Sequence, residues 1–308
     1  MLNHHVLLAF SLGLLWMSCK DHRQELSSPT LGEVTIAGDR QMEALLTQQE
    51  EMFEHHYKYA KVNMVYGSET DIFKWLGNDS IKTIAAFRPL TEGEHRYFNS
   101  IQIHPREFPF ATGALALLAH KEAPDSALIY ESFIGLCRGD STVASSFTTV
   151  VVEDAASGIA RFLLDKTGQD RFSDRVFTLP DKETIFQYLQ SRKEAIAVVD
   201  WADYSDSDDR LRQQELENVK ILGLTRPKDS LQMGFLRPDQ YNLQDHKYPL
   251  TRKLYFISVS GRSDLGLGFA SFVSGEIGQR ILLKAGLLPE YQAERWIELK
   301  SEGFQVVE

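Results

Sequence analysis

Cysteine is scarce in this sequence: 308 residues contain two, Cys19 and Cys137. Two cysteines exclude a disulfide framework and a cysteine-rich zinc site. Cationic residues are also in the minority, with 33 Lys and Arg against 43 Asp and Glu, which gives a formal net charge of −10. This balance argues against a protein that binds the phosphate backbone of nucleic acids, although it leaves room for a locally basic pocket.

The sequence also lacks the signatures of common enzymes and cofactor sites. It contains no Gly-x-Ser-x-Gly elbow, Walker A loop or His-Glu-x-x-His helix. Gly266 and Gly268 match half of a dinucleotide fingerprint, but Ser271 stands at its last glycine position, so a tight turn explains them better. His55 and His56 are adjacent and would point to different faces of a helix, which is poor geometry for a metal. We therefore expect no enzyme activity, no cofactor and no metal site.

The chain begins with a targeting segment. Residues 6–17 form an apolar stretch that is long enough for the core of a signal peptide and too short to cross a bilayer. Ser18 directly before Cys19, followed by a polar tract, resembles a bacterial lipoprotein cleavage site. We expect a signal peptide over residues 1–18 and a lipid on Cys19. A cleaved secretory signal that leaves Cys19 as an incidental thiol is the alternative.

Residues 19–31 are rich in charged and amide side chains and include serines and a proline, which indicates a flexible tether. The mature chain is therefore expected in the cell envelope, on the periplasmic or extracytoplasmic face, anchored to the lipid bilayer through Cys19.

The first part of the mature chain alternates between strand and helix patterns. Strands are predicted over 33–37, 62–66 and 81–87, and helices over 42–53 and 72–76. Such alternation predicts a parallel sheet with helices on its faces.

A second series follows the apolar run at 108–119, which fits a fully buried strand. Helices are predicted near 126–137, from Ser157 and over 182–190, and strands over 147–152 and 195–199. A further strand at 253–260 and a helix at 269–283 end the pattern. Because 308 residues exceed the size at which one core keeps growing, we expect two lobes. The two long apolar strands would cross between the lobes and form a two-strand hinge.

A charge-dense stretch lies within the second series, at about 203–215. Its pattern is typical of a solvated loop or a mobile helix end. A tail that docks a partner is the alternative.

Several segments resemble the substrate-binding proteins of phosphate ABC transporters. They are AFRPLTEGE at 86–94, VVEDAASGIARF at 151–162, YPLTRKLY at 248–255, GFASFVSGEIGQRIL at 268–282 and GLLP at 286–289. The resemblance implies an α/β, two-lobed periplasmic-binding-protein-like fold of type II, each lobe a mostly parallel sheet flanked by helices. Lobe I would comprise residues 32–112 and 252–308, and lobe II residues 113–251.

The resemblance also implies a function. A monomeric solute-binding protein would capture phosphate or a related oxyanion in a cleft between the lobes, without covalent chemistry, and deliver it to the membrane subunits of an ABC importer. Strand-to-helix turns suit this role, because they present unpaired backbone N–H groups and the positive end of a helix dipole to an anion.

Turns after the predicted strands supply the candidate ligand-binding residues. They are Gly38, Asp39, Arg40, Ser68, Arg88, Ser157 and Gly158. The glycines permit close backbone approach, and arginine offers paired donors to oxyanion oxygens. Ser157 and Gly158 resemble the Ser-Gly-Thr turn of the family, which donates backbone and hydroxyl hydrogen bonds.

Ordinary structural roles compete with binding at several positions. Asp39 and Ser157 are equally suited to cap helices, and Arg88 to pair with the glutamates that follow it. Arg161 is interpreted as a solvated helix residue, and Arg252 as part of a structural pair near the hinge. If Asp39 does enter the cleft, its carboxylate would accept a hydrogen bond from a protonated oxyanion. It would thereby select hydrogen phosphate over fully deprotonated phosphate.

The sequence departs from the family pattern in the second lobe. The phosphate-clamping arginine of the family, four positions before the serine, corresponds to Glu153, and its threonine corresponds to Ile159. A carboxylate that faced the cleft would repel an anion, unless Arg40 from the opposite lobe supplied the missing cation. The alternative function is therefore a divergent binding, sensor or scaffold protein whose anion site is altered or lost.

Overall fold

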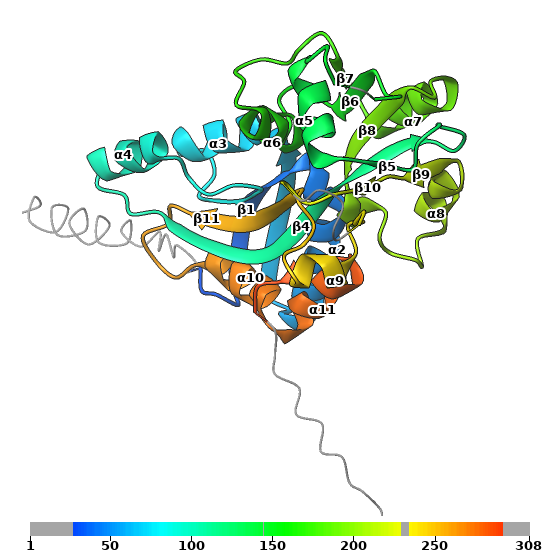
Figure 1. The fold of residues 1–308 in the computed structure, drawn as a ribbon. Helices are drawn as coiled ribbons and strands as arrows, with labels where there is room; N and C mark the ends of the chain where they lie inside the picture. The colour runs from blue at the N-terminus through cyan, green and yellow to red at the C-terminus, as the bar shows by residue number, and fades with distance from the viewer. Residues whose placement is uncertain (1–26, 144, 229–233, 292–308) are drawn as a thin grey trace, which may run out of the picture.

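One continuous sheet runs through both halves of the molecule (Figure 1). The computed structural model describes residues 27–143, 145–228 and 234–291. The strands of this sheet are β1 (Gly32–Asp39), β2 (Ala60–Gly67), β3 (Thr83–Ala86), β4 (Arg106–His120), β6 (Thr149–Glu153), β7 (Val176–Leu179), β8 (Ala195–Asp200), β9 (Val219–Ile221), β11 (Thr251–Ser258) and β12 (Leu288–Pro289). Their order is β2-β1-β3-β11-β4-β8-β6-β7, and β12 and β9 also pair with β4.

Helices cover both faces of the sheet. They are α2 (Glu43–His56), α3 (Glu69–Gly77), α4 (Glu92–Ser100), α5 (Tyr130–Arg138), α6 (Gly158–Thr167), α7 (Lys182–Ser191), α8 (Arg210–Glu217), α9 (Gln240–Gln244), α10 (Leu265–Ser274) and α11 (Glu276–Lys284), with the 3₁₀ helices η2 (Arg40–Met42) and η3 (Trp201–Asp203). A separate parallel pair joins β5 (Ala127–Leu128) to β10 (Gly223–Leu224).

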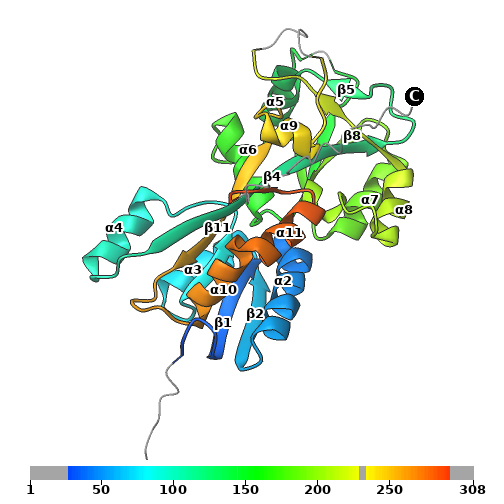
Figure 2. The same cartoon turned by 90° about the horizontal axis from the view of Figure 1, so that it is seen from below.

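Lobe I is built on the parallel strands β1, β2 and β3. Helices α2, α10 and α11 pack together over one face of these strands, as Figure 2 shows. Aromatic side chains fill this layer; the rings of Phe53 and Phe269, for example, meet edge to face with their centroids 5.4 Å apart. Helices α3 and α4 cover the other face, where Ile72 and Phe98 are buried against β3.

Lobe II repeats the arrangement on β6, β7 and β8, in which β6 pairs in parallel with both neighbours. Because successive side chains of a strand point to opposite faces, Val150 and Val152 of β6 pack with α5 and α6, whereas Val151 packs with α7. Both faces of this strand are thus buried, which explains its unbroken run of valines.

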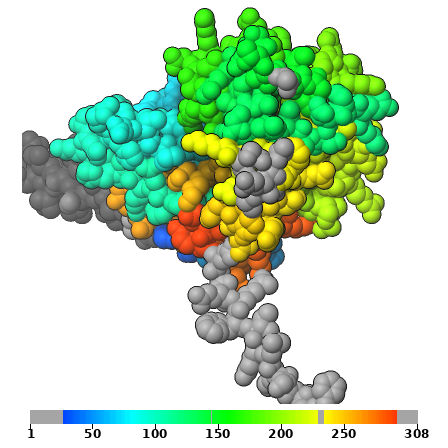
Figure 3. Space-filling view, viewed as in Figure 1, coloured from blue at the N-terminus to red at the C-terminus, as the bar shows by residue number. Residues whose placement is uncertain are grey.

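Strand β4 belongs to both lobes. Its first part, through Ala114, pairs antiparallel with β11, and its second part, from Leu115, pairs antiparallel with β8. The predicted buried strand at 108–119 is therefore the central element of the molecule, and β11 runs back beside it. The predicted lobe boundaries at 112/113 and 251/252 fall close to this change of partner and stay a prediction. Figure 3 colours lobe I mainly cyan and orange and lobe II mainly green, and the two lobes are in contact on the face that it shows.

The structure corrects three details of the sequence analysis. The helix predicted over 269–283 is two helices, because the chain is extended at Gly275 between α10 and α11. The helix predicted near 126–137 starts only at Tyr130, after the short strand β5. Helix α4 was not predicted, although the capping box of Thr91 and Glu94 marks its start.

The predicted signal peptide, Cys19 and most of the tether lie outside the described residues. Within the residues that are described, no helix combines the length and the apolar character that spanning a bilayer requires.

Candidate functional site

The carboxyl ends of the parallel strands of both lobes meet at the boundary between the lobes. In lobe I, β1 ends at Asp39, β2 at Gly67 and β3 at Ala86; in lobe II, β6 ends at Glu153 and β8 at Asp200. Helices or helical turns begin within a few residues of these ends, so their N-termini point into the same region. In open α/β sheets this is the edge at which ligands bind, and it holds most of the predicted site residues.

Gly158, the first residue of α6, is the point on which the lobes converge. A Cβ atom at this position would lie 3.1 Å from Oε2 of Glu69, and close to two further side chains of lobe I: 3.3 Å from Nη1 of Arg252 and 3.4 Å from Oδ2 of Asp39. A Cβ here would require the side chains of Glu69 and Arg252 to shift by a few tenths of an ångström. Three charged side chains therefore face the N-terminus of one helix, where the dipole is positive.

Ser157 shapes this helix start. Its hydroxyl accepts a hydrogen bond from the backbone N–H of Ala160 at 3.2 Å and donates one to the carbonyl of Glu153 at 2.6 Å. The helix cap that the sequence permits is therefore formed. Ser157 and Gly158 hold the N-terminus of α6 against lobe I, and both are buried.

Arg252 of β11 is almost fully buried and holds the hinge. Its Nη2 donates to Oδ2 of Asp200 at 2.6 Å and to the side-chain oxygen of Gln41 at 3.1 Å, and its guanidinium lies 3.3 Å above the ring of Phe87. Its Nε and Nη1 have no hydrogen-bond partner among the described residues. The structural pair anticipated for Arg252 is present, and of its two unpaired nitrogens Nη1 lies near Gly158 of lobe II.

Asp39 combines the two roles that the sequence analysis considered. Oδ1 accepts a hydrogen bond from the backbone N–H of Gln41 at 2.9 Å, which caps the helical turn that follows β1. Oδ2 is buried and, within the described part of the chain, unpaired. Burial raises the pKa of Asp39 to about 7, against the hydrogen bond from Gln41 and the charge of Arg252, which lower it. This carboxyl group therefore titrates near neutral pH.

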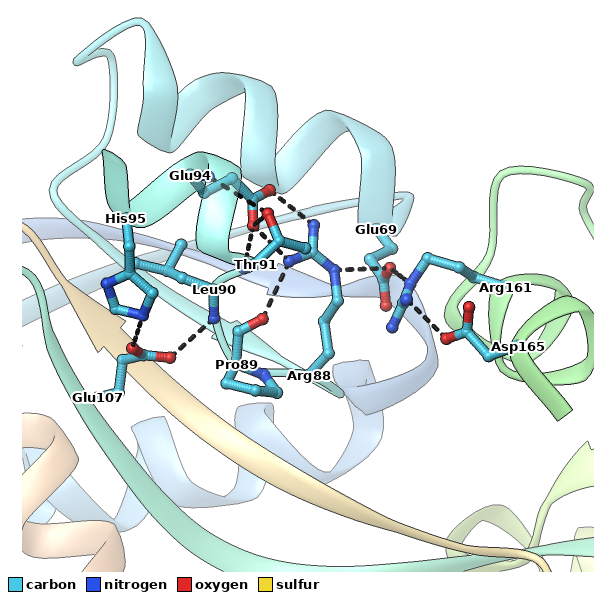
Figure 4. A network of polar contacts seen from close by, with 10 residues as sticks. All are labelled: Glu69, Arg88, Pro89, Leu90, Thr91, Glu94, His95, Glu107, Arg161 and Asp165. Carbon is cyan, nitrogen blue, oxygen red and sulfur yellow. Dashed lines mark hydrogen bonds and ion pairs between the residues drawn. The ribbon is translucent and has the colours of Figure 1, made fainter. Parts of the chain in front are cut away.

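Glu69 bridges the two lobes, as Figure 4 shows. It is the first residue of α3, and Oε1 accepts hydrogen bonds from Nε of Arg88, at 3.2 Å, and from Nε of Arg161 of lobe II. Arg161 also pairs with Asp165, at 2.8 Å. The sequence analysis missed Glu69, although its place directly after Gly67 and Ser68 at the end of a strand was a usable signal.

The other predicted residues have mainly structural contacts. Arg88 forms two hydrogen bonds to Glu94, at 2.7 and 2.8 Å. Ser68 forms a capping box with Asp71 at the start of α3. A Cβ atom on Gly38 would meet Leu46 at 2.6 Å, so packing within lobe I already demands glycine there.

Glu153, the main departure from the family pattern, lies at the boundary but is not isolated from cations. Burial raises its pKa, and the charges of Lys182 and Arg40 oppose that shift. Arg40 is exposed and belongs to the opposite lobe. Arg40 and Glu153 line the same small hollow between the lobes, and compensation of Glu153 by Arg40 stays a prediction.

Two cavities of unequal size lie between the lobes. A hollow of about 10 Å³ is lined by Asp39, Arg40, Gln41, Ser68, Glu153, Asp154 and Ser157, which is room for about one water molecule. A cavity of about 130 Å³ lies on the other side of Gln41, between Phe87 and Asp203. The hollow beside Asp39 and Ser157 would therefore admit a ligand of the size of phosphate only when the lobes separate.

Two broader surface hollows, of about 590 and 690 Å³, lie elsewhere on lobe II. The first contains Arg138 and Arg171, which are exposed and lie near the C-terminal ends of α5 and α6, where cations favour the helix dipole. Buried, unpaired charges mark the boundary between the lobes and not these hollows. Among the described residues, no cluster of three or more His, Cys, Asp or Glu has the arrangement of a metal site.

Comparison with known proteins agrees with this architecture. A model of the PBP superfamily domain matches residues 23–276, whereas no curated protein matches the sequence. A solved structure of a putative phosphate ABC transporter substrate-binding protein with bound phosphate, from Clostridium perfringens, is 16% identical with a TM-score of 0.67, over 84% of this chain and 100% of that one. An ABC-type phosphate transport receptor from Vibrio cholerae is 18% identical with a TM-score of 0.64, over 84% and 100%.

A regulator has the same fold. The regulatory domain of CcmR from Synechocystis PCC6803, in complex with 2-PG, is 14% identical with a TM-score of 0.51, over 79% of this chain and 96% of that one. Identities this low show the fold alone, and the fold is the two-lobed α/β architecture that the sequence predicts. With a family model that matches most of its length, the chain belongs to the PBP superfamily.

Proposed function

We propose that this protein is a solute-binding lipoprotein that captures phosphate or a related oxyanion between its lobes and delivers it to the membrane subunits of an ABC importer. One observation carries the proposal. The N-terminus of α6 at Gly158 and the unpaired Nη1 donor of Arg252 meet at the boundary between the lobes. Backbone N–H groups, a helix dipole and a buried guanidinium together form an anion site that needs no metal.

The acidic groups at this boundary are compatible with an anion. Asp39 has Arg252 beside it, and Glu153 has Lys182 and Arg40. With a pKa of about 7, Asp39 donates a hydrogen bond to an oxyanion when protonated and accepts one from a protonated oxyanion when ionised. We therefore keep Asp39, Arg40, Ser157 and Gly158 as proposed ligand contacts and add Arg252, whereas packing and capping account for Gly38 and Ser68.

Capture would follow from closure of the lobes and would involve no covalent step. Strand β4 changes partner between Ala114 and Leu115, so bending there would separate the ends of β1 and β2 from α6. A ligand that contacts both lobes binds the closed state more tightly than the open one, and this difference in affinity is what drives closure.

The place of action is also part of the proposal. A signal peptide over residues 1–18 and a lipid on Cys19 would place the protein in the cell envelope, as a monomer close to the importer. The two solved phosphate-transport proteins of the same fold are named for that process.

Calorimetric titration of the purified protein, freed of bound ligand by dialysis, tests the function. We expect saturable heat with phosphate, and the panel includes arsenate, sulfate and a phosphonate. Gly158→Ala should weaken binding at least tenfold, because its Cβ would crowd three charged groups. Gly93→Ala is the matched control, since its Cβ would meet only Thr91 at 3.9 Å. Absence of heat with every anion would reject the oxyanion function.

The alternative is a sensor or scaffold that shares the fold and binds no free oxyanion. Two observations favour this alternative. The carboxylates of Glu69 and Asp39 lie at the N-terminus of α6, where an anion would otherwise bind. A regulatory domain also has the same fold. The titration separates the two proposals, because a sensor of this kind gives no heat with the four anions.

A further inference from the structure

Glu69 places its carboxylate at the N-terminus of α6, where the proposed function expects an anion. Its carboxylate is nearly inaccessible to solvent, with the side chain 4% exposed, and it belongs to lobe I. Oε2 lies 3.1 Å from the place of a Cβ on Gly158, the first residue of α6 in lobe II. The positive helix dipole that would attract an oxyanion also favours a carboxylate at this place, although Oε2 accepts no hydrogen bond from the described residues.

Two guanidinium groups bracket this carboxylate. Arg161 donates to Oε1 from α6, and Arg88 donates to the same oxygen from the opposite side (Figure 4). Arg88 is also held by both oxygens of Glu94. Arg161 has Asp165 as its other partner, whose side chain is 62% exposed. Arg161 is therefore the cation that is freer to change partners.

The fit of Glu69 is incomplete. Its Oε2 has no hydrogen-bond partner in the described residues, and neither have Oδ2 of Asp39 and Nη1 of Arg252, which approach the same glycine. Unpaired buried charges of this kind destabilise the closed arrangement. An external anion with more oxygen atoms than a carboxylate would use the free donor of Arg252 in addition to Arg161 and α6.

We propose that Glu69 is a tethered substitute for the ligand, which closes the lobes through Arg161 and which the oxyanion must displace when it binds. The inference rests on the proposed oxyanion function and names the ligand class: a tetrahedral dianion such as hydrogen phosphate. Such a dianion brings more charge and more acceptor atoms to Arg161 and Arg252 than the carboxylate that it replaces. Arg161 transfers from Glu69 to the ligand, whereas Arg88 stays on Glu94.

Titration with inorganic phosphate tests the displacement. In Glu69→Gln the competing charge is removed, and we expect the affinity for phosphate to rise at least tenfold. In Arg161→Gln a cation of the bracket is removed, and we expect it to fall at least tenfold. Glu276→Gln is the matched control. Glu276 is also the first residue of a helix and pairs with an arginine, Arg280, but it lies on the surface. The affinity of this variant for phosphate should equal that of the wild type.

Small-angle X-ray scattering without phosphate is the second measurement. Both Glu69→Gln and Arg161→Gln lack the bridge, so each should have a larger radius of gyration than the wild type and Glu276→Gln. Because Arg161 is partly exposed, its variant should fold even if Glu69→Gln does not. Unchanged affinity in Glu69→Gln, or an unchanged radius in Arg161→Gln, would overturn the inference.

The outcomes also separate this inference from the proposed function. If the wild type binds phosphate and Glu69→Gln binds it equally, only the displacement by Glu69 is wrong. If no variant binds phosphate, the oxyanion function and the displacement are both wrong. A larger radius of gyration for the variants would then identify the bridge as a lobe contact alone, and it would not rescue the displacement.

Discussion

Two of the ion pairs between the lobes, Arg252 with Asp200 and Glu69 with Arg161, differ in what would happen to them when the lobes separate. The first, Arg252 with Asp200, lies in the sheet: Arg252 is opposite Gly113 of β4, and Asp200 is opposite Leu115 of the same strand. Because both partners are hydrogen-bonded to neighbouring residues of one strand, bending of β4 moves them little. Their side chains are 3% and 4% exposed.

The second ion pair joins Glu69, in the first turn of α3, to Arg161, in the first turn of α6. No strand links these two helices directly. Separation of the lobes would break it. Its partners are unequally buried, 4% and 38% exposed, so water can replace Glu69 as the partner of Arg161. The comparison teaches that charge alone does not define a role: the pair within the sheet is buried and supports the fold, whereas the pair between the helices is the one that we propose to control separation of the lobes.

The largest expected effect is on the hinge pair. Arg252→Met would leave the carboxylate of Asp200 buried without its cation, and such a loss costs about 3–5 kcal/mol of stability. Unfolding in urea measures it. The adjacent Lys253→Met is the control, because Lys253 pairs with Glu290 on the surface at 2.9 Å, and exposed pairs contribute about 1 kcal/mol or less. Equal losses in the two variants would contradict a structural role for the hinge pair.

The next effect depends on pH and concerns Asp39, which lies beside both pairs. Its pKa is about 7 in the folded protein and near 3.8 in the unfolded chain. At pH values between these two pKa values, Asp39 carries a proton in the folded protein but not in the unfolded chain. The free energy of unfolding should therefore fall as the pH rises through this range. From pH 5 to pH 7 the loss is about 2 kcal/mol, because the full slope of about 1.4 kcal/mol for each pH unit declines as the group reaches its folded pKa.

Asp39→Asn isolates this contribution, since the amide can still cap η2 and does not titrate. Urea unfolding of wild type and variant at pH 5, 6, 7 and 8 should give curves that diverge with rising pH, and the variant should be the more stable at pH 8. Parallel curves would show that Asp39 does not hold a proton in the folded protein.

A smaller effect is expected at the cap of α6. Ser157→Ala removes the acceptor for the N–H of Ala160 and should lower stability by about 1 kcal/mol, the usual cost of losing a serine cap. Ser68→Ala is a comparison on α3, which has the same kind of cap. If the N-terminus of α6 binds the ligand, only Ser157→Ala should also weaken phosphate binding. A similar loss of affinity in both variants would argue against that site.

The smallest change in stability is expected for the bridge across the cleft. Arg161→Gln leaves Glu69 with Arg88 as a partner, so the free energy of unfolding should fall by about 1 kcal/mol or less. Urea unfolding beside Arg252→Met provides the direct test. A loss as large as that of Arg252→Met would remove the distinction between the two ion pairs.

Local patterns predicted most of the elements but few of the contacts between them. The valines of β6 and the apolar run of β4 mark buried strands, and the positions of Ser157 and Asp39 after strands mark helix starts. Arg88 next to a glutamate-rich segment also suggested its pairing with Glu94. All of these depend on residues a few positions apart, whose geometry is set by the backbone period.

The site itself was predicted only in part. Asp39, Ser157 and Gly158 were expected together because strand ends meet at one edge of a sheet. The partners Arg252 and Asp200, and likewise Glu69 and Arg161, lie 52 and 92 positions apart in the chain. No periodicity connects residues at such separations. For Gly38 the structure adds a packing role, since a Cβ there would meet Leu46, and its role in binding stays a prediction.

The amino-acid sequence by itself determined the α/β class, the helix starts and the strand ends, because hydrophobic period and capping act over a few residues. Only the tertiary structure decided which charged groups of lobe I face α6 of lobe II and which of them remain unpaired. That choice depends on the twist of the sheet and on the packing of both lobes around β4. Burial then gives these contacts their energetic weight, since a charge without its partner is costly only where water cannot reach it.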